Sequence, residues 1–255
     1  MRHVFTSGAF DDIRAADIRF LEEAAKIGAL TVDLWSDEQI ATLTGSPPKF
    51  PAAERRYFLE AVRYVSRVVE DEPAQLDGTI QVVRASTAQN PPAGAVVIDE
   101  SAILAYPPVP ICPANPRSDR KKVLVTGCFD WFHSGHVRFF EEVSEIGDLY
   151  VIVGHDANIR LLKGEGHPLL PEHQRRYVAG AIRFAKMALI SSGEGWLDAE
   201  PEIDRLRPDI YAVNEDGDRS EKADFCARKG IEYRVLKRAP KLGLPKRSST
   251  DLRGF

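Results

Sequence analysis

Short apolar runs alternate with longer segments of mixed polarity along most of the chain. In the second half, apolar residues fill nearly every position of the short runs, which is typical of strands buried on both faces of a sheet. The longer segments space their apolar residues as helices do. The predicted elements are a strand at 122–126, a helix at 136–145, a strand at 149–153, a helix at 172–186, a strand at 188–191, a helix at 200–205 and a strand at 210–213. This alternation indicates an α/β fold with a doubly wound parallel sheet.

A sequence repeat extends this pattern to the first half. Residues 8–28, GAFDDIRAADIRFLEEAAKIG, match residues 127–147, GCFDWFHSGHVRFFEEVSEIG, with nine of 21 positions identical. A second block, residues 51–63, matches residues 171–183 at almost the same offset, with a shared proline, Arg-Arg-Tyr and arginine. Two matched blocks at nearly one offset indicate a tandem duplication. We therefore predict two doubly wound parallel-sheet domains in tandem.

A proline-rich stretch marks the predicted boundary between the two copies. Residues 107–116 read PPVPICPANP and hold five prolines. Proline fixes φ and removes a hydrogen-bond donor, so the stretch is predicted to be an extended linker. The predicted organisation is a first domain at 1–105, a linker at 106–120 and a second domain at 121–255.

The composition excludes several classes of protein. The 255 residues are 44% hydrophobic and 28% charged, with a net charge of −4 at pH 7, which is typical of a globular protein and not of a general nucleic-acid binder. The apolar runs are far shorter than the roughly 20 residues that span a bilayer, and no apolar leader opens the chain. The three cysteines, Cys112, Cys128 and Cys226, are too widely spaced for a disulfide framework. We expect a cytoplasmic protein with no membrane span and no nucleic-acid partner.

Positive charge gathers near the C-terminus. Residues 234–253 contain seven lysines and arginines against Asp251 alone. A short basic segment on a nearly neutral domain suits a compact polyanion such as a nucleoside triphosphate. A solvated basic tail is the alternative interpretation.

The turn after the first strand of the second half carries two histidines three residues apart. Its sequence, TGCFDWFHSGH, ends with His133 and His136 at the start of a predicted helix. A helix N-terminus has free N–H groups and a partial positive charge, so the pair is suited to phosphate oxygens. A zinc site and two surface histidines are the alternatives, but zinc requires further ligands that the neighbouring sequence does not supply. No GxGxxG dinucleotide fingerprint is present.

Two further segments add candidate phosphate ligands. Ser248, Ser249 and Thr250 are consecutive hydroxyl residues at a predicted helix start. Lys163 lies on a glycine-rich loop after the second strand of this half.

Taken together, these segments resemble the cytidylyltransferase-like superfamily of nucleotidyltransferases, which carry an HxGH motif. His133, Gly135 and His136 match HxGH position for position, and RSSTDLR at 247–253 resembles the C-terminal motif of the superfamily. Arg175 matches its arginine on the second helix. The resemblance covers residues 122–253 and, as a diverged copy, residues 4–100. It implies a Rossmann-like fold in both copies.

The resemblance also implies a reaction and a set of site residues. A phosphate oxygen of the acceptor attacks the α-phosphorus of a nucleoside triphosphate directly, and pyrophosphate leaves. Such a transfer depends mostly on positioning and electrostatics. The implied catalytic residues are His133, His136, Lys163 and Arg175, and the implied nucleotide-binding residues are Gly127, Cys128, Phe129, Asp130, Gly135, Ser248, Ser249 and Thr250. Mg²⁺ is expected with the triphosphate, and its protein ligands stay unassigned.

The first copy has lost this chemistry at the corresponding positions. Arg14, Ala15, Ala16 and Asp17 stand where the second copy has HSGH. An aspartate there would repel a triphosphate, so the first domain is predicted to be inactive. Because single-domain members of the superfamily pair as dimers, the resemblance implies an intramolecular pseudo-dimer, with which further homodimerisation is compatible.

The nucleotide and the acceptor are left open by the sequence. The tandem architecture is similar to that of cytidylyltransferases, but Gly243 and Lys246 stand where their RTxGIST motif has arginine and glycine. The loop RLLKGEGHPLLP resembles that of adenylyltransferases acting on heptose 1-phosphate. We predict transfer from CTP, or alternatively ATP, to a small phosphorylated alcohol or sugar. A non-catalytic nucleotide sensor is the alternative of another class.

Overall fold

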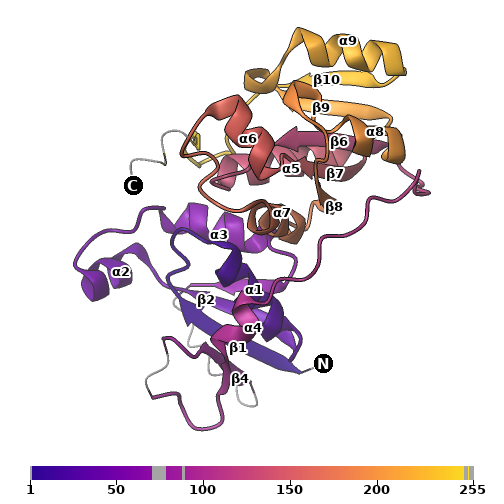
Figure 1. Cartoon of the computed structure of the whole chain (residues 1–255). Coiled ribbons are helices and arrows are strands. Elements are labelled where there is room, and N and C mark those ends of the chain that lie inside the picture. Colours follow the sequence, from indigo (N-terminus) through magenta and orange to yellow (C-terminus); the bar gives the residue numbers. More distant parts are fainter. Residues whose placement is uncertain (1, 71–78, 88–89, 250–251, 253–255) are drawn as a thin grey trace. The chain divides into compact units, whose positions relative to one another are not determined.

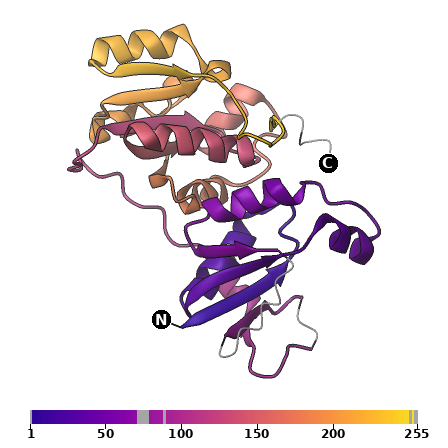
Figure 2. The ribbon, with the colours of Figure 1, turned by 180° about the vertical axis from the view of Figure 1, so that it is seen from behind.

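We describe the protein from a computed structural model, which describes residues 2–70, 79–87, 90–249 and 252. The chain separates into two compact units between Pro107 and Pro108. Figure 1 shows the elements of both units, and Figure 2 shows them from behind. Each unit is described by itself.

The first unit is built on a five-stranded sheet. Its elements are β1 (His3–Gly8), α1 (Ala15–Ala25), β2 (Ala29–Leu34), α2 (Asp37–Thr44), α3 (Ala52–Ala61), β3 (Val65–Val69), β4 (Ile80–Arg84), β5 (Val96–Ile98) and α4 (Glu100–Leu104). The strand order is β3-β2-β1-β4-β5, and every pair is parallel.

The second unit is built on another five-stranded sheet. Its elements are β6 (Lys122–Gly127), α5 (Ser134–Ile146), β7 (Asp148–Val153), α6 (Asp156–Lys163), α7 (Glu172–Ala181), β8 (Ala185–Ile190), η1 (Gly195–Leu197), α8 (Glu200–Leu206), β9 (Ile210–Asn214), η2 (Glu215–Gly217), α9 (Ser220–Lys229) and β10 (Glu232–Leu236). The strand order is β10-β9-β6-β7-β8, again with every pair parallel.

The two sheets have the same topology. In each, the first strand is central, the next two strands lie on one side of it, and the last two lie on the other. The predicted α/β fold with two parallel sheets is therefore confirmed. In the described part of the chain, no helix is both long enough and apolar enough to cross a bilayer.

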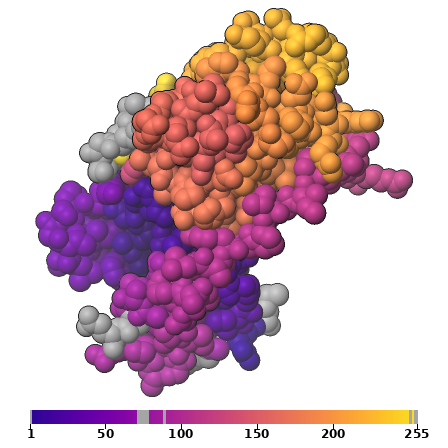
Figure 3. Space-filling view, in the orientation of Figure 1, coloured from indigo at the N-terminus to yellow at the C-terminus, as the bar shows by residue number. Residues whose placement is uncertain are grey.

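Several element boundaries differ from the sequence prediction. The predicted helix at 172–186 ends at Ala181, because β8 already begins at Ala185. Lys163, predicted to lie on a glycine-rich loop after β7, is the last residue of the helix α6, whose eight residues are too few to show a clear apolar period. This helix lies on the surface of the second unit (Figure 3), and Leu161 on it is 69% exposed.

Part of the predicted linker packs against the second unit. The backbone N–H of Asn115 donates to the carbonyl of Arg205 at 2.6 Å, and the Lys122 ammonium donates to the Asn115 side chain at 2.6 Å. Arg205 in turn donates to the carbonyl of Cys112 at 3.1 Å. The stretch at 112–115 is therefore held against α8 and the start of β6.

The topology of the second unit determines where a ligand can bind. The chain leaves β6 toward β7 on one side, and β9 lies on the other side of β6. In parallel α/β sheets, the crevice at such a switch point, at the carboxyl ends of the strands, is the usual binding place. The functional site is therefore expected where Gly127 ends β6 and Asn214 ends β9.

Candidate functional site

A cavity of about 390 Å³ lies at the carboxyl ends of β6 and β9. Ten of the twenty residues that line it were predicted from the sequence as catalytic or nucleotide-binding residues. The lining residues are Thr126, Gly127, Cys128, Phe129, Asp130, His133, Gly135, His136, Phe139, Lys163, Trp196, Val213, Asn214, Asp216, Gly217, Arg219, Lys222, Arg238, Ser248 and Ser249.

The turn after β6 is shaped by a buried phenylalanine. Phe129 has a left-handed backbone with φ of 51°, which is uncommon for a residue other than glycine. Its ring is buried against Phe140 and against the edge of His136, with ring centroids 5.4 Å and 5.2 Å apart. Phe10, at the corresponding turn of the first unit, also has a left-handed backbone, with φ of 44°. The turn geometry is therefore common to the two folds, and packing stabilises it in the second unit.

The two histidines are oriented by the backbone of the helix that they begin. His133 is the N-cap of α5, and its Nδ1 accepts a hydrogen bond from the N–H of Gly135 at 3.1 Å. Nδ1 of His136 accepts from the N–H of His133 at 3.4 Å. The two rings stack with centroids 4.0 Å apart. Because both Nδ1 atoms accept, each neutral imidazole carries its proton on Nε2 and can donate there.

Gly135 is required between these histidines because the His133 ring folds back over it. A Cβ at this position would lie 2.9 Å from Cε1 and 3.0 Å from Nδ1 of His133. Contacts that short displace the ring. The glycine of HxGH therefore leaves room for the His133 ring to cap the helix, and this capping bond orients the ring.

Two groups of the site are kept uncharged by their surroundings. Burial lowers the pKa of His136 well below its usual value, and His133, Arg238 and Lys163 lower it further. His136 is therefore a neutral donor at neutral pH. Burial raises the pKa of the Cys128 thiol, although Lys163 opposes this change. Cys128 thus has the properties of a packing residue and not of a nucleophile.

Asp130 connects the first turn to the loop that follows α6. Its Oδ1 and Oδ2 accept from the N–H of Leu169 at 2.8 Å and 2.9 Å, and Oδ1 also accepts from the N–H of Leu170 at 2.9 Å. The side chain is buried. Asp130 therefore positions the loop, and both of its carboxylate oxygens already accept hydrogen bonds.

Arg175 is not among the residues that line the cavity. Its side chain is buried, and its guanidinium donates to the carbonyls of Leu170 at 2.8 Å, Cys128 at 2.6 Å and Gly154 at 2.8 Å. It also forms an ion pair with Asp156 at 2.6 Å. These bonds join α7 to the turn after β6 and to the end of β7.

Arg55 makes the same bonds in the first unit. It donates to the carbonyls of Ala9 at 2.5 Å and Trp35 at 2.9 Å, and it pairs with Asp37 at 2.7 Å. The first unit has no histidine at its corresponding turn. The shared arrangement of Arg55 and Arg175 therefore indicates that these bonds support the fold whether or not the histidines are present.

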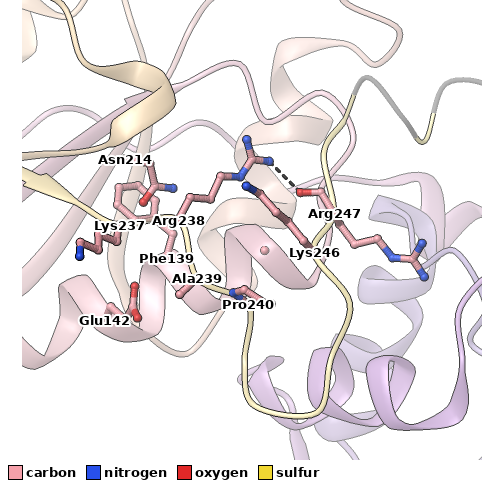
Figure 4. A pocket seen from close by; sticks show the side chains of 10 residues that line it. Phe139, Glu142, Asn214, Lys237, Arg238, Ala239, Pro240, Lys246 and Arg247 are labelled. Atoms are coloured by element: carbon pink, nitrogen blue, oxygen red, sulfur yellow. Dashed lines mark hydrogen bonds between the residues drawn. The ribbon is translucent and has the colours of Figure 1, made fainter.

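The C-terminal hydroxyl residues are brought to the site from far along the sequence. Ser248 and Ser249 line the cavity, and Ser249 donates to the carbonyl of Trp131 at 3.2 Å. Thr250 lies outside the described residues. Arg238 donates to the carbonyl of Arg247 at 2.7 Å (Figure 4). It also pairs with Asp216. Part of the basic segment is therefore folded beside the cavity.

Among the cavity residues that the sequence pattern did not point to are Trp196 in η1 and Arg219 and Lys222 at the start of α9. Arg238, after β10, belongs to the basic segment that was expected to suit a polyanion. The rule that led to the histidines also applies to the start of α9, because α9 follows β9 and β9 pairs with β6. Recognising a helix at 220–229 would have been sufficient to find Arg219 and Lys222.

The described side chains do not form a metal centre of their own. Within residues 2–70, 79–87, 90–249 and 252, no three His, Cys, Asp or Glu side chains are arranged to hold a metal ion. In the cavity, Asp130 accepts from backbone N–H groups, and Asp216 pairs with Arg238.

In the first unit, the polar groups at the corresponding turn pair with one another. Asp17 accepts from the N–H of Arg14 at 2.8 Å and from the Arg84 guanidinium at 3.0 Å. Arg84 also pairs with Glu100 at 3.1 Å. The charged side chains of the first unit thus form ion pairs with one another at the position where the second unit has an open cavity.

Comparison with known proteins points to one family. The family model described as cytidylyltransferase-like matches residues 124–254. An FAD synthase from Ferroglobus placidus is 36% identical over 120 residues, which are 46% of this chain and 75% of that protein. An FAD synthase from Pyrococcus horikoshii is 43% identical over 104 residues, which are 40% of this chain and 68% of that protein. The bifunctional protein HldE from Syntrophotalea carbinolica is 35% identical over 101 residues, but these are only 20% of its length.

Proposed function

The chain belongs to the cytidylyltransferase-like family and is a nucleotidyltransferase, and from this premise we propose that its second unit is the catalytic one. The proposed reaction transfers the nucleoside monophosphate of a nucleoside triphosphate to the phosphate of a small phosphorylated alcohol or sugar. The observation that carries this proposal is the cavity that joins His133, His136, Lys163 and Ser248–Ser249.

The proposed reaction is an in-line displacement at the α-phosphorus. An oxygen of the acceptor phosphate forms a new bond to this phosphorus. The bond from the α-phosphorus to the oxygen that bridges it to the β-phosphorus breaks, and pyrophosphate leaves with the electron pair. No covalent enzyme intermediate and no net proton transfer are needed. The protein contributes by orienting both phosphates and by stabilising the charge that shifts between them.

The histidines would supply the donors for that charge. Each ring presents an Nε2–H, and a hydrogen bond from it strengthens as negative charge builds on the transferring group. Lys163 would bridge the triphosphate and the acceptor phosphate, and Ser248 and Ser249 would hold the β- and γ-phosphates. Mg²⁺ would arrive with the triphosphate as part of the substrate. Arg175 would act as a positioning residue through the turn that it supports.

Different observations favour the two candidate nucleotides. FAD contains an adenylate group, so the FAD synthases among the relatives favour ATP. The family description favours CTP. We place ATP first, because relatives of known product are more specific than a family description.

Pyrophosphate release tests the proposed function. The full chain is supplied with ATP or CTP, magnesium and one of a panel of acceptors: FMN, glycerol 3-phosphate and several sugar 1-phosphates. We expect release that depends on one acceptor and a product that contains both phosphates in a new anhydride. Nucleotide binding without release for any acceptor would contradict the transferase and favour a nucleotide sensor.

Asp17→His is expected to leave pyrophosphate release unchanged. The substitution restores one histidine, but Arg84 at the end of β4 stays paired with Glu100 beside the start of α1, and no counterpart of Ser248–Ser249 precedes the linker. The lost Asp17–Arg84 pair is partly exposed, with 32% and 24% of the side chains accessible, so the stability cost is about 1 kcal/mol or less. The measurements are initial rate and melting temperature. A gain in rate, or nucleotide bound at the first unit, would refute its assignment as inactive.

A further inference from the structure

One wall of the cavity carries two cations that the proposed roles do not use. It is formed by the 3₁₀ turn η1 and the first turn of α9, and it contributes Trp196, Arg219 and Lys222. Of the groups that would act on the triphosphate, the histidines begin α5 and the serines lie near the C-terminus. The cations on α9 come from a different element and follow a different strand.

Lys222 is a buried cation without a partner in the described part of the chain. Its side chain is 8% exposed, and no hydrogen bond or ion pair with a described residue holds its ammonium. Its Nζ lies 5.6 Å from the centre of the Tyr211 ring, and the Tyr211 hydroxyl is 2.6 Å from Oγ1 of Thr126 at the end of β6. Burial lowers the pKa of Lys222, and the nearby Asp198 opposes this change. Burying a charge in this way costs free energy of folding unless a nearby anion pairs with it.

Arg219 adds a second cation on the same side of the helix start. It is the N-cap of α9, three residues before Lys222, and residues at this spacing lie on one side of a helix. Its guanidinium lies 5.3 Å from the centre of the Trp196 ring and forms no ion pair with a described residue. The N-terminus of this ten-residue helix itself favours anions.

The acidic side chains near these cations are engaged elsewhere. Asp216 pairs with Arg238, Asp218 accepts from the Tyr233 hydroxyl at 2.9 Å, and Asp198 accepts from the Ser191 hydroxyl at 2.7 Å. None of them comes within ion-pair distance of Lys222. Asp198 and Asp218 therefore act on Lys222 only at longer range, where each opposes the lowering of its pKa, and no described carboxylate forms an ion pair with Lys222 or Arg219.

We propose that Lys222 and Arg219 form a separate anion site that binds the phosphate of the acceptor. The proposal rests on the proposed function, in which the acceptor is a phosphomonoester. The exposed ring of Trp196 lies beside the site and would contact the organic part of the acceptor. Lys222 would thus help to select the acceptor by its phosphate, while the histidines and serines act on the nucleotide.

Inorganic phosphate is the probe for this site. It is titrated into the isotope-labelled full chain, and the indole N–H signals of Trp196 and Trp131 are followed by NMR. Trp196 reports on the α9 wall, and Trp131 reports on the C-terminal serines, because its carbonyl accepts from Ser249. We expect a saturable shift of Trp196 in the wild type. Lys222→Met should weaken phosphate binding at Trp196 by about tenfold or more, because it removes a charge-assisted contact, without abolishing the response of Trp131.

Two variants provide the controls. Arg228→Met removes one positive charge from an exposed position on the same helix, and it should leave phosphate binding at Trp196 within about twofold of the wild type. Lys222→Arg keeps the cation and should retain most of the binding. Lys222→Met should not lower the melting temperature, because replacing a buried charge with an apolar side chain of similar length is often neutral or stabilising.

Several results would overturn the proposal. They are a wild-type Trp196 signal that does not respond to phosphate, an unchanged affinity in Lys222→Met, and an equal loss in Arg228→Met. None of these measurements requires turnover. Absence of pyrophosphate release with every acceptor would contradict the proposed function alone, whereas loss of the Trp196 response contradicts the anion site alone. With an accepted substrate, Lys222→Met should raise KM for the acceptor and leave KM for the nucleotide nearly unchanged.

Discussion

His136→Ala is expected to lower the rate of pyrophosphate release by on the order of 10²-fold or more. The physical reason is differential binding: the Nε2–H of a fixed imidazole interacts more strongly with the transition state than with the bound nucleotide. Removing one preorganised donor of this kind typically costs about 3–4 kcal/mol of transition-state stabilisation. Because burial keeps His136 neutral, the loss is that of a hydrogen-bond donor and not of a cation.

The loss of rate must be compared with any loss of stability, because His136 also packs against Phe129 and Phe132. The ring centroids are 5.2 Å and 5.1 Å apart. A modest loss of stability is therefore expected, and melting temperature measures it. His3→Ala, at an exposed position of the first unit, is the matched control and should change neither quantity. If His136→Ala kept full turnover on an accepted substrate, the transferase mechanism would be wrong, and the sensor interpretation would be favoured.

Arg175→Met is expected to destabilise the second unit by about 3–5 kcal/mol, which is typical when one partner of a buried charged network is removed. The substitution leaves the carbonyls of Cys128, Gly154 and Leu170 and the carboxylate of Asp156 without their common donor. The turn that carries the histidines should loosen, so activity falls together with stability. Thermal unfolding and pyrophosphate release measure the two effects.

The twin residue provides the control for this prediction. Arg55→Met breaks the same set of bonds in the first unit, and it should lower the stability of that unit while the second unit keeps its activity below the transition. The resemblance to the superfamily assigns Arg175 a phosphate contact instead. In that case, Arg175→Met would lose activity at unchanged melting temperature, which is the result that would contradict a positioning role.

The sequence was sufficient for the fold class, because burial on both faces of a parallel sheet leaves a visible pattern. The strands at 149–153 and 210–213 are continuous apolar runs, and the strand at 122–126 has an apolar centre at 123–125. Runs of this kind between amphipathic helices are typical of strands covered on both faces. The histidines could also be found, because a helix start that binds phosphate needs particular residues at a fixed local spacing. Short elements such as α6 escaped prediction, since eight residues show little periodicity.

Tertiary structure alone decided what the other charged residues do. Arg175 was expected among the phosphate ligands, yet its partners are carbonyls on three segments that meet only after folding. A predicted helix at 220–229 would place Lys222 near the site, but its burial has no local signal, because it depends on Tyr211 and on the pairing of β9 with β6. Local spacing can specify a turn or a helix cap. Whether a cation forms hydrogen bonds or ion pairs depends on groups that are distant in the sequence and meet it only after folding. The sequence by itself therefore determined the strand pattern and the HxGH turn, and only the folded chain distinguished the arginine that supports this turn from the lysine that faces the cavity.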